Sequence, residues 1–306
     1  MRRLSGLHRI RRVSKQHPEQ LLETTDLARR DFVRAAVGTG FAASVVPVTA
    51  QTVKTDYTGL TAGEVTIMVG DFKLPAYRAM PEGKTASTKL PVVLVISEIF
   101  GVHEHIADVA RRFAKLGYLA IAPELFVRQG DAQSYGEIGK LIAEVVSKVP
   151  DAQVMSDLDA CVAWANANCG DAARLAITGF CWGGRITWLF TAHNAAVKAG
   201  VAWYGQLLGE PSALKPANPI DVVGQLKAPV LALYGGKDTG IPLTAVEKMK
   251  TALATSPNPA ATQSQFVVYP GAEHAFHADY RPSYQKLAAE DSWKRCVAWL
   301  SNNGVS

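Results

Sequence analysis

The sequence lacks the features that mark several large classes of protein. It has only four cysteines in 306 residues and no CxxC pair, which excludes a disulfide scaffold and a cysteine-rich zinc site. After residue 50 it has no uncharged apolar run of about 18 residues, the minimum for an internal membrane-spanning helix. It also has no glycine-rich phosphate-binding loop, so the nucleotide-binding classes that depend on one are not indicated.

Excess positive charge is confined to the first fifty residues. The whole chain has 32 Lys and Arg against 27 Asp and Glu, a formal net charge of +5. Nine of the basic and four of the acidic side chains precede residue 51, so residues 51–306 hold 23 of each sign. A nucleic-acid-binding surface needs clustered positive charge on the folded domain. We therefore predict no nucleic-acid partner.

The N-terminal fifty residues have the parts of an export signal. Residues 29–34 read Arg-Arg-Asp-Phe-Val-Arg, and a run of small and apolar residues follows from Ala35 to Val46. Small residues ending at Ala50 then offer a cleavage site. The paired arginines resemble a bacterial twin-arginine signal. We predict that residues 1–50 are a leader and that the mature protein is periplasmic and free of the membrane. A basic tail before a cytoplasmic domain is the alternative.

Residues 51–306 are expected to form a single α/β domain with a mostly parallel sheet. A hairpin is predicted around Gly70-Asp71, and apolar β-branched runs then alternate with segments of helical spacing. Strands are expected at 64–69, 72–80, 91–97, 118–122, 175–179, 197–204, 230–234 and 265–269. Helices are expected at 105–116, 135–149, 152–167 with Asp151 as N-cap, 182–193, 243–255 and 288–302, and a loop at 205–225.

The segment Gly179-Phe180-Cys181-Trp182-Gly183-Gly184 lies between a predicted strand and a predicted helix. It matches the nucleophile elbow, with cysteine as the nucleophile, in which small neighbours allow the strand and helix to approach closely. The helix N-terminus favours negative charge and so favours the thiolate of Cys181. A small buried cysteine in a glycine-rich packing turn is the alternative.

An acid and a histidine follow this cysteine in the order typical of one hydrolase class. Asp238 comes directly after the strand predicted at 230–234, and His274 lies in the last turn before the final helix. Nucleophile, acid and histidine would then all lie at the carboxyl ends of strands. His274 would accept the thiol proton and Asp238 would orient the imidazole. His277 is a second candidate, but the Gly-Ala-Glu-His context favours His274.

The domain resembles the dienelactone hydrolase (carboxymethylenebutenolidase) family from about residue 57 to residue 300. The segments that carry the resemblance are Glu98-Ile99-Phe100-Gly101, Pro123-Glu124-Leu125-Phe126, the elbow, Gly235-Gly236-Lys237-Asp238 and Gly271-Ala272-Glu273-His274-Ala275-Phe276. The resemblance implies an α/β-hydrolase fold without a large lid domain. It also implies a Cys181-Asp238-His274 triad that hydrolyses small esters or lactones through a thioester, with no cofactor and no metal.

The resemblance assigns roles to further residues. Glu98 would hold the resting thiol and help to generate the thiolate, and the backbone N–H groups of Ile99 and Trp182 would form the oxyanion hole. Arg128 would contact a substrate carboxylate, with a solvated loop arginine as the alternative. The family's second substrate arginine is replaced by Ala278, so a dienelactone substrate is less well supported than the chemistry. Apart from the resemblance, aromatic side chains are expected to line an apolar pocket, with core packing as the alternative for Trp203 and Tyr204. They are Phe126, Trp182, Trp203, Tyr204 and Phe276.

Several questions stay open on the sequence alone. A general carboxylesterase and a non-catalytic binding scaffold are the competing functions, and neither the substrate nor the oligomeric state is indicated. His103 and His105 could suggest a metal site, but residues two apart do not share a helix face. We therefore predict no metal there.

Overall fold

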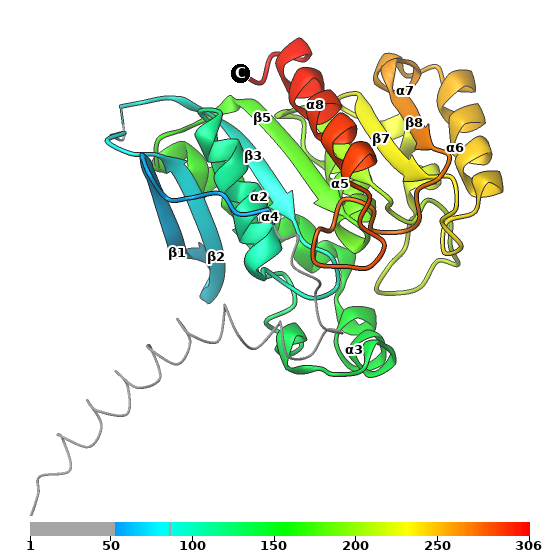
Figure 1. Ribbon diagram of the computed structural model, residues 1–306, viewed down its shortest axis with the longest axis horizontal. Coiled ribbons are helices and arrows are strands. Elements are labelled where there is room, and N and C mark those ends of the chain that lie inside the picture. The colour runs from blue at the N-terminus through cyan, green and yellow to red at the C-terminus, as the bar shows by residue number, and fades with distance from the viewer. Residues whose placement is uncertain (1–52, 86) are drawn as a thin grey trace, which may run out of the picture.

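Eight strands form one mixed sheet in the computed structural model, which describes residues 53–85 and 87–306. The predicted leader at 1–50 lies outside these residues. The strand order is β1-β2-β4-β3-β5-β6-β7-β8 (Figure 1). The strands are β1 (Leu60–Val69), β2 (Phe72–Pro81), β3 (Leu90–Ile96), β4 (Leu119–Pro123), β5 (Gly170–Phe180), β6 (Val197–Trp203), β7 (Val230–Gly235) and β8 (Gln265–Tyr269).

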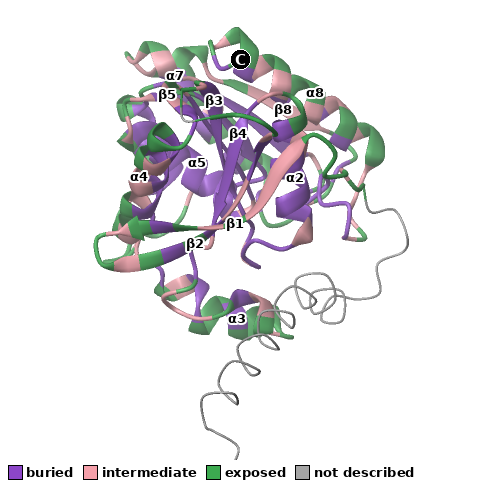
Figure 2. Ribbon diagram, turned by 90° about the vertical axis from the view of Figure 1, so that its left-hand side faces the viewer, coloured by how far each residue is buried: buried purple, intermediate pink, exposed green. Residues whose placement is uncertain are grey.

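The predicted hairpin forms the antiparallel edge of the sheet. Val69 pairs with Phe72 across a two-residue turn, where Gly70 has a φ of 57° that few other residues adopt readily. β2 is antiparallel to β4, and every later pair, from β3–β4 to β7–β8, is parallel. β3 and β4 are buried along their whole length (Figure 2), and so is β7, as their continuous apolar runs predict.

Helices cover both faces of this sheet. They are α2 (Glu104–Lys115), α3 (Ile138–Glu144), α4 (Asp151–Ala167), α5 (Trp182–His193), α6 (Leu243–Thr255), α7 (Pro259–Gln263) and α8 (Lys286–Asn302). α2 and α8 lie on one face, where the rings of Phe113 and Trp293 pack 4.7 Å apart, and α4 and α5 lie on the other (Figure 1). Within residues 53–85 and 87–306, no helix is both long and apolar enough to cross a bilayer.

Three local predictions were wrong. The helix expected at 135–149 is only α3, flanked by short 3-10 turns, because Gly136 and Gly139 weaken its first turn. Asp151 is not an N-cap but the first residue of α4, and its carboxylate instead pairs with Arg185. The loop expected at 205–225 ends in a 3-10 helix, Pro219–Gln225, that proline and a capping box at Asn218 begin.

Candidate active site

Cys181 lies in the sharp turn between β5 and α5. Its backbone has φ 54° and ψ −112°, a region that side chains with a Cβ seldom occupy. The turn is fixed by hydrogen bonds on both sides: Cys181 N donates to Trp203 O, and Gly184 N donates to Cys181 O. The strained turn therefore presents the thiol at the carboxyl edge of the sheet and at the N-terminus of α5, as the elbow motif predicts.

The glycines of the elbow are required by close packing. A Cβ on Gly183 would collide with the carbonyl of Ile96 and lie 2.6 Å from that of Ser97. A Cβ on Gly184 would lie 2.6 Å from the carbonyl of Trp203. Ile96 is the last residue of β3 and Ser97 follows it, while Trp203 is the last residue of β6. β3 and β6 are the two strands that flank β5. Glycine at both positions thus lets α5 begin directly against the sheet.

Asp238 and His274 meet beside the elbow. His274 Nδ1 lies 2.7 Å from Asp238 Oδ2, and the Asp238 carboxylate is buried. Asp238 Oδ1 accepts hydrogen bonds from the backbone N–H groups of Gly240 and Ile241 at 2.8 and 3.0 Å. Both carboxylate oxygens are therefore held, and the imidazole is fixed through Nδ1 with Nε2 left for another partner.

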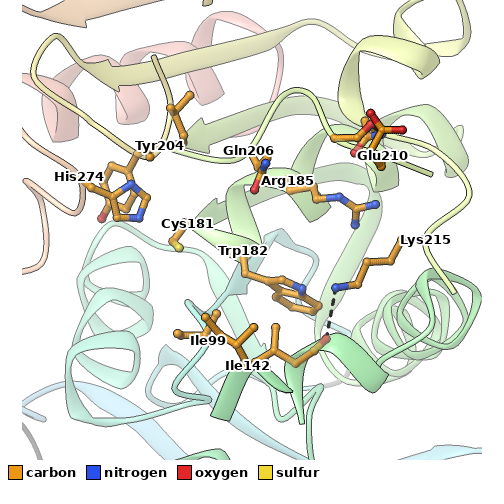
Figure 3. A pocket seen from close by; sticks show the side chains of 15 residues that line it. Ile99, Ile142, Cys181, Trp182, Arg185, Tyr204, Gln206, Glu210, Lys215 and His274 are labelled. Atoms are coloured by element: carbon orange, nitrogen blue, oxygen red, sulfur yellow. Dashed lines mark hydrogen bonds between the residues drawn. The ribbon is translucent and has the colours of Figure 1, made fainter. Parts of the chain in front are cut away.

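That other partner is the Cys181 thiol, which lies beside His274 in the same pocket (Figure 3). Burial by itself lowers the pKa of His274, but hydrogen bonds and charge interactions with Asp238 and Cys181 raise it to about 10. A histidine that holds a proton this strongly is a base suited to accept the proton of the Cys181 thiol. The three residues predicted as a triad are thus brought together by three separate loops.

Glu98 is buried close behind this group and is held by residues other than the thiol. Its Oε2 lies 3.2 Å from His103 Nε2 and accepts a hydrogen bond from the Tyr280 hydroxyl at 3.0 Å. Burial raises its pKa, but the hydrogen bond from His103 and the nearby charges of His103, His105 and Arg281 hold it below its usual range. The role assigned to Glu98 at the thiol stays a prediction.

The two backbone N–H groups predicted as an oxyanion hole lie at the same edge. Trp182 is the first residue of α5, so its N–H has no acceptor within the helix. Ile99 follows Glu98 in the loop after β3 and lines the pocket together with Cys181 and Trp182. Among the described residues, neither N–H donates to a backbone carbonyl. Both are therefore available to a substrate oxygen.

Cys181 and His274 open onto a cavity of about 470 Å³ (Figure 3). Tyr204 lines it, as predicted, and its ring packs edge-on against His274 with 5.1 Å between centroids. The other lining residues are Ile99, Ile142, Val146, Trp182, Arg185, Gln206, Gly209, Glu210, Lys215, Asn218, Gly240 and Ile241. A mostly apolar cavity of this size fits a small organic substrate.

Three residues predicted to bind substrate do not line this cavity. Arg128 forms a two-pronged salt bridge with buried Asp157, at 2.5 and 2.7 Å, and stacks on Phe72. Phe126 packs behind Trp182 with 4.6 Å between rings, and Phe276 packs behind Tyr204 at 5.4 Å. Because the Arg128 guanidinium already has a carboxylate partner, the geometry gives its predicted role no support. The two phenylalanines support lining residues from behind.

The buried histidines are paired with acids and aromatic rings. His103 faces Glu98, and His105 Nδ1 lies 2.8 Å from Asp279 Oδ1. His277 packs against Trp203 with 4.5 Å between rings, so it is His274 that meets Asp238. In the part of the chain that the structure describes, no group of three or more His, Cys, Asp or Glu is placed to hold a metal ion.

Sequence reasoning missed most of the residues that line the cavity and both residues that hold Glu98. Arg185 and Lys215 line the cavity, and His103 and Tyr280 hold Glu98. Lys215 lies in a loop rich in glycine and proline and belongs to no motif. Arg185 follows the elbow glycines directly, so its position in the sequence could have indicated that it lies near the site.

Residues 74–304 match the Dienelactone hydrolase family. The chain belongs to this family. It is 58% identical over 288 residues to a protein of Methylorubrum extorquens named "Putative carboxymethylenebutenolidase", with 94% of this chain and 97% of the relative covered. A crystal structure described as "Putative Dienelactone Hydrolase from Klebsiella pneumoniae" is 54% identical with a TM-score of 0.76, and covers 79% of this chain and 98% of that chain.

The fold extends to more distant hydrolases. Thermogutta terrifontis esterase 2 has a TM-score of 0.60 at 14% identity, with 82% of this chain and 96% of that chain covered. At this identity the likeness concerns the fold alone. The predicted family, the α/β-hydrolase fold and the hydrolase class are thus confirmed.

Iodoacetamide is expected to alkylate Cys181 at least about tenfold faster than the other three cysteines, because only a thiolate reacts. Cys181 is partly exposed in the cavity, whereas Cys161, Cys169 and Cys296 are buried. Burial also raises the pKa of Cys161 and of Cys296 well above the usual range. Peptide mass spectrometry over a time course measures the four rates. Unfolded protein, in which all four should react alike, is the control, and equal rates in folded protein would contradict an activated thiol.

Proposed function

We propose that the protein hydrolyses small esters or lactones with Cys181 as nucleophile and His274 and Asp238 as its catalytic partners. One observation carries the proposal: a thiol in a strained elbow and an acid-held imidazole share one wall of a small cavity. The family supports the hydrolase class.

The first half of the cycle forms a thioester. His274 Nε2 takes the thiol proton, and the Cys181 sulfur attacks the ester carbonyl. The developing oxyanion is stabilised by the N–H groups of Ile99 and Trp182 and by the N-terminal end of α5. The C–O bond then breaks, and the imidazolium returns its proton to the leaving alkoxide. For a lactone the alcohol stays attached to the acyl group, because the ring has opened.

The second half restores the enzyme. Water loses a proton to His274 Nε2 and attacks the thioester carbonyl, and the same two N–H groups stabilise the second oxyanion. The C–S bond breaks, the carboxylic acid leaves, and the imidazolium returns its proton to the Cys181 sulfur. Asp238 stays ionised throughout and stabilises the imidazolium formed in each half. The cavity of about 470 Å³ favours small substrates over peptides or long-chain esters.

Rapid mixing with 4-nitrophenyl acetate tests this cycle. We expect a burst of 4-nitrophenol of about one equivalent per chain where deacylation is the slower half, and an acetyl group on the Cys181 peptide after acid quenching. The Cys181→Ala variant should show neither the burst nor the adduct. Hydrolysis by the wild-type protein with the acetyl group on another residue would refute the proposal, and so would the absence of all hydrolysis.

A further inference from the structure

The end of the cavity away from His274 contains a cation that has no acidic partner. Figure 3 shows Cys181 and His274 at one end, Lys215 and Arg185 at the other, and the Trp182 indole between them. The Lys215 amine donates to one carbonyl, that of Val146, at 3.3 Å, which is long for such a bond. In the described parts of the chain, no carboxylate lies within ion-pair distance of it.

The other charges around this end leave Lys215 as the group that can receive an anion. Arg185 is already neutralised by Asp151, with two bonds of 2.7 and 2.8 Å, and also donates to the carbonyl of Ala217. Glu210, the one acidic lining residue, is exposed and forms no ion pair with Lys215 among the residues described. An ammonium group has three donors, of which Lys215 uses one in the structure.

A second donor points to the same place. The Trp182 side chain is 9% exposed, and its Nε1 is buried without a partner in the described residues. Figure 3 shows this nitrogen turned toward the Lys215 amine. A buried N–H without a hydrogen-bond acceptor is unfavourable, and an acceptor atom of a bound ligand would remove this cost. Trp182 thus offers a backbone N–H at the elbow and an indole N–H toward the far end of the cavity.

The loop that carries Lys215 is anchored before any ligand arrives. Lys215 N donates to the carbonyl of Ser212, and the next-door carbonyl of Leu214 accepts from Asp151 N at 2.8 Å. Two residues further on, the Ala217 carbonyl is held by Arg185. Burial and the charge of Arg185 lower the pKa of Lys215, while the charge of Asp151 acts in the opposite direction. A bound anion would therefore favour the charged form of the partly buried Lys215 amine.

We propose that Lys215, assisted by the Trp182 indole, is the specificity-determining residue that binds a carboxylate of the substrate, several bonds from the scissile carbonyl. The inference rests on the proposed function, since it names the substrate class of the same site. The substrate carboxylate would then be recognised by a residue of the loop after β6. Arg128, which the resemblance assigned to that role, is already paired with Asp157. Arg185 acts as a positioning residue, because it holds the loop through Asp151 and Ala217.

Matched esters test the inference. The acyl-side pair is the mono-4-nitrophenyl ester of glutarate, which has a free carboxylate, and the 4-nitrophenyl ester of glutaramic acid, which has a neutral amide in its place. The alcohol-side pair is the acetyl esters of 3-hydroxybenzoate and 3-hydroxybenzamide. In at least one pair, Lys215→Met should lower kcat/KM for the charged member by roughly 10- to 100-fold, the range for a lost charge-assisted hydrogen bond. The neutral member should change less than about twofold, because Lys215 touches no reacting atom.

Two further variants complete the design. Lys215→Arg keeps the charge and should keep most of the preference for the charged ester, while Lys248→Met removes an exposed lysine of α6 and should change nothing. Calorimetry with glutaramate and with 3-hydroxybenzoate gives a readout besides turnover: Cys181→Ala should bind at least one of them, and the added Lys215→Met change should weaken that binding by a similar factor. Equal effects on charged and neutral esters in both pairs, or unchanged binding of both carboxylates, would overturn the inference while Cys181-dependent hydrolysis left the proposed function standing.

Discussion

Replacement of Cys181 by alanine is expected to lower kcat for ester hydrolysis by about 10⁴- to 10⁶-fold, the range seen when a nucleophile is removed from a catalytic triad. The effect is this large because the variant has no atom that can form the thioester. His274 and Asp238 would remain hydrogen-bonded to each other but would have no thiol to activate. Steady-state kinetics on 4-nitrophenyl acetate measures the loss, with the rate in buffer alone as the floor.

The fold should survive this change. The Cys181 side chain is partly exposed in the cavity, and alanine tolerates the elbow geometry no worse than cysteine does. The Cys161→Ala variant is the matched control, since it removes a buried thiol of α4 and should leave kcat within about twofold, because the site is untouched. Similar midpoints of thermal unfolding for wild type and Cys181→Ala would exclude misfolding, and near-wild-type turnover by the variant would rule out Cys181 as nucleophile.

The parts of the molecule that could be predicted are those in which one local requirement determines the residues. β3 and β7 are buried on both faces, so their apolar runs identify them. The elbow needs glycine wherever α5 meets backbone, and the carboxyl ends of parallel strands bring Cys181, Asp238 and His274 to one edge. Each requirement is written in a short stretch of sequence.

The residues that could not be predicted act through contacts between distant segments. Arg128 has a guanidinium well suited to a carboxylate, but that carboxylate is Asp157 in α4. Asp151 has the pattern of a helix cap, yet its partner is Arg185 in α5. Lys215 lies in a loop without periodicity, and only the folded chain brings it opposite Trp182. Pairing of this kind depends on how α4, α5 and the loop after β6 pack, which no local pattern encodes.

Replacement of Asp238 by asparagine is expected to lower kcat by about 10³- to 10⁴-fold, although asparagine has nearly the same shape as aspartate. The loss arises because the amide reverses the tautomer of His274. Asp238 Oδ1 accepts two backbone N–H bonds, from Gly240 and Ile241, so the amide oxygen would take that position. The amide nitrogen would then face His274 Nδ1 and donate to it. The neutral ring would then carry its proton on Nε2. With a proton already on it, Nε2 could no longer accept the proton of the Cys181 thiol.

The same variant should change the pH dependence in a defined direction. In the wild type the pKa of His274 is raised from 6.5 to about 10. Protonated His274 therefore contributes fully to the free energy of unfolding below pH 6.5, and this contribution is lost as the pH rises through 10. Without the Asp238 charge this pKa should fall toward 6.5, and the variant should lack that loss of stability between pH 6.5 and 10. Alkylation of Cys181 near pH 7 should also slow, because the imidazolium that stabilises the thiolate is lost. Urea unfolding at several pH values and the alkylation time course measure the two effects. An unchanged alkylation rate together with an unchanged stability profile would show that Asp238 does not control the proton on His274.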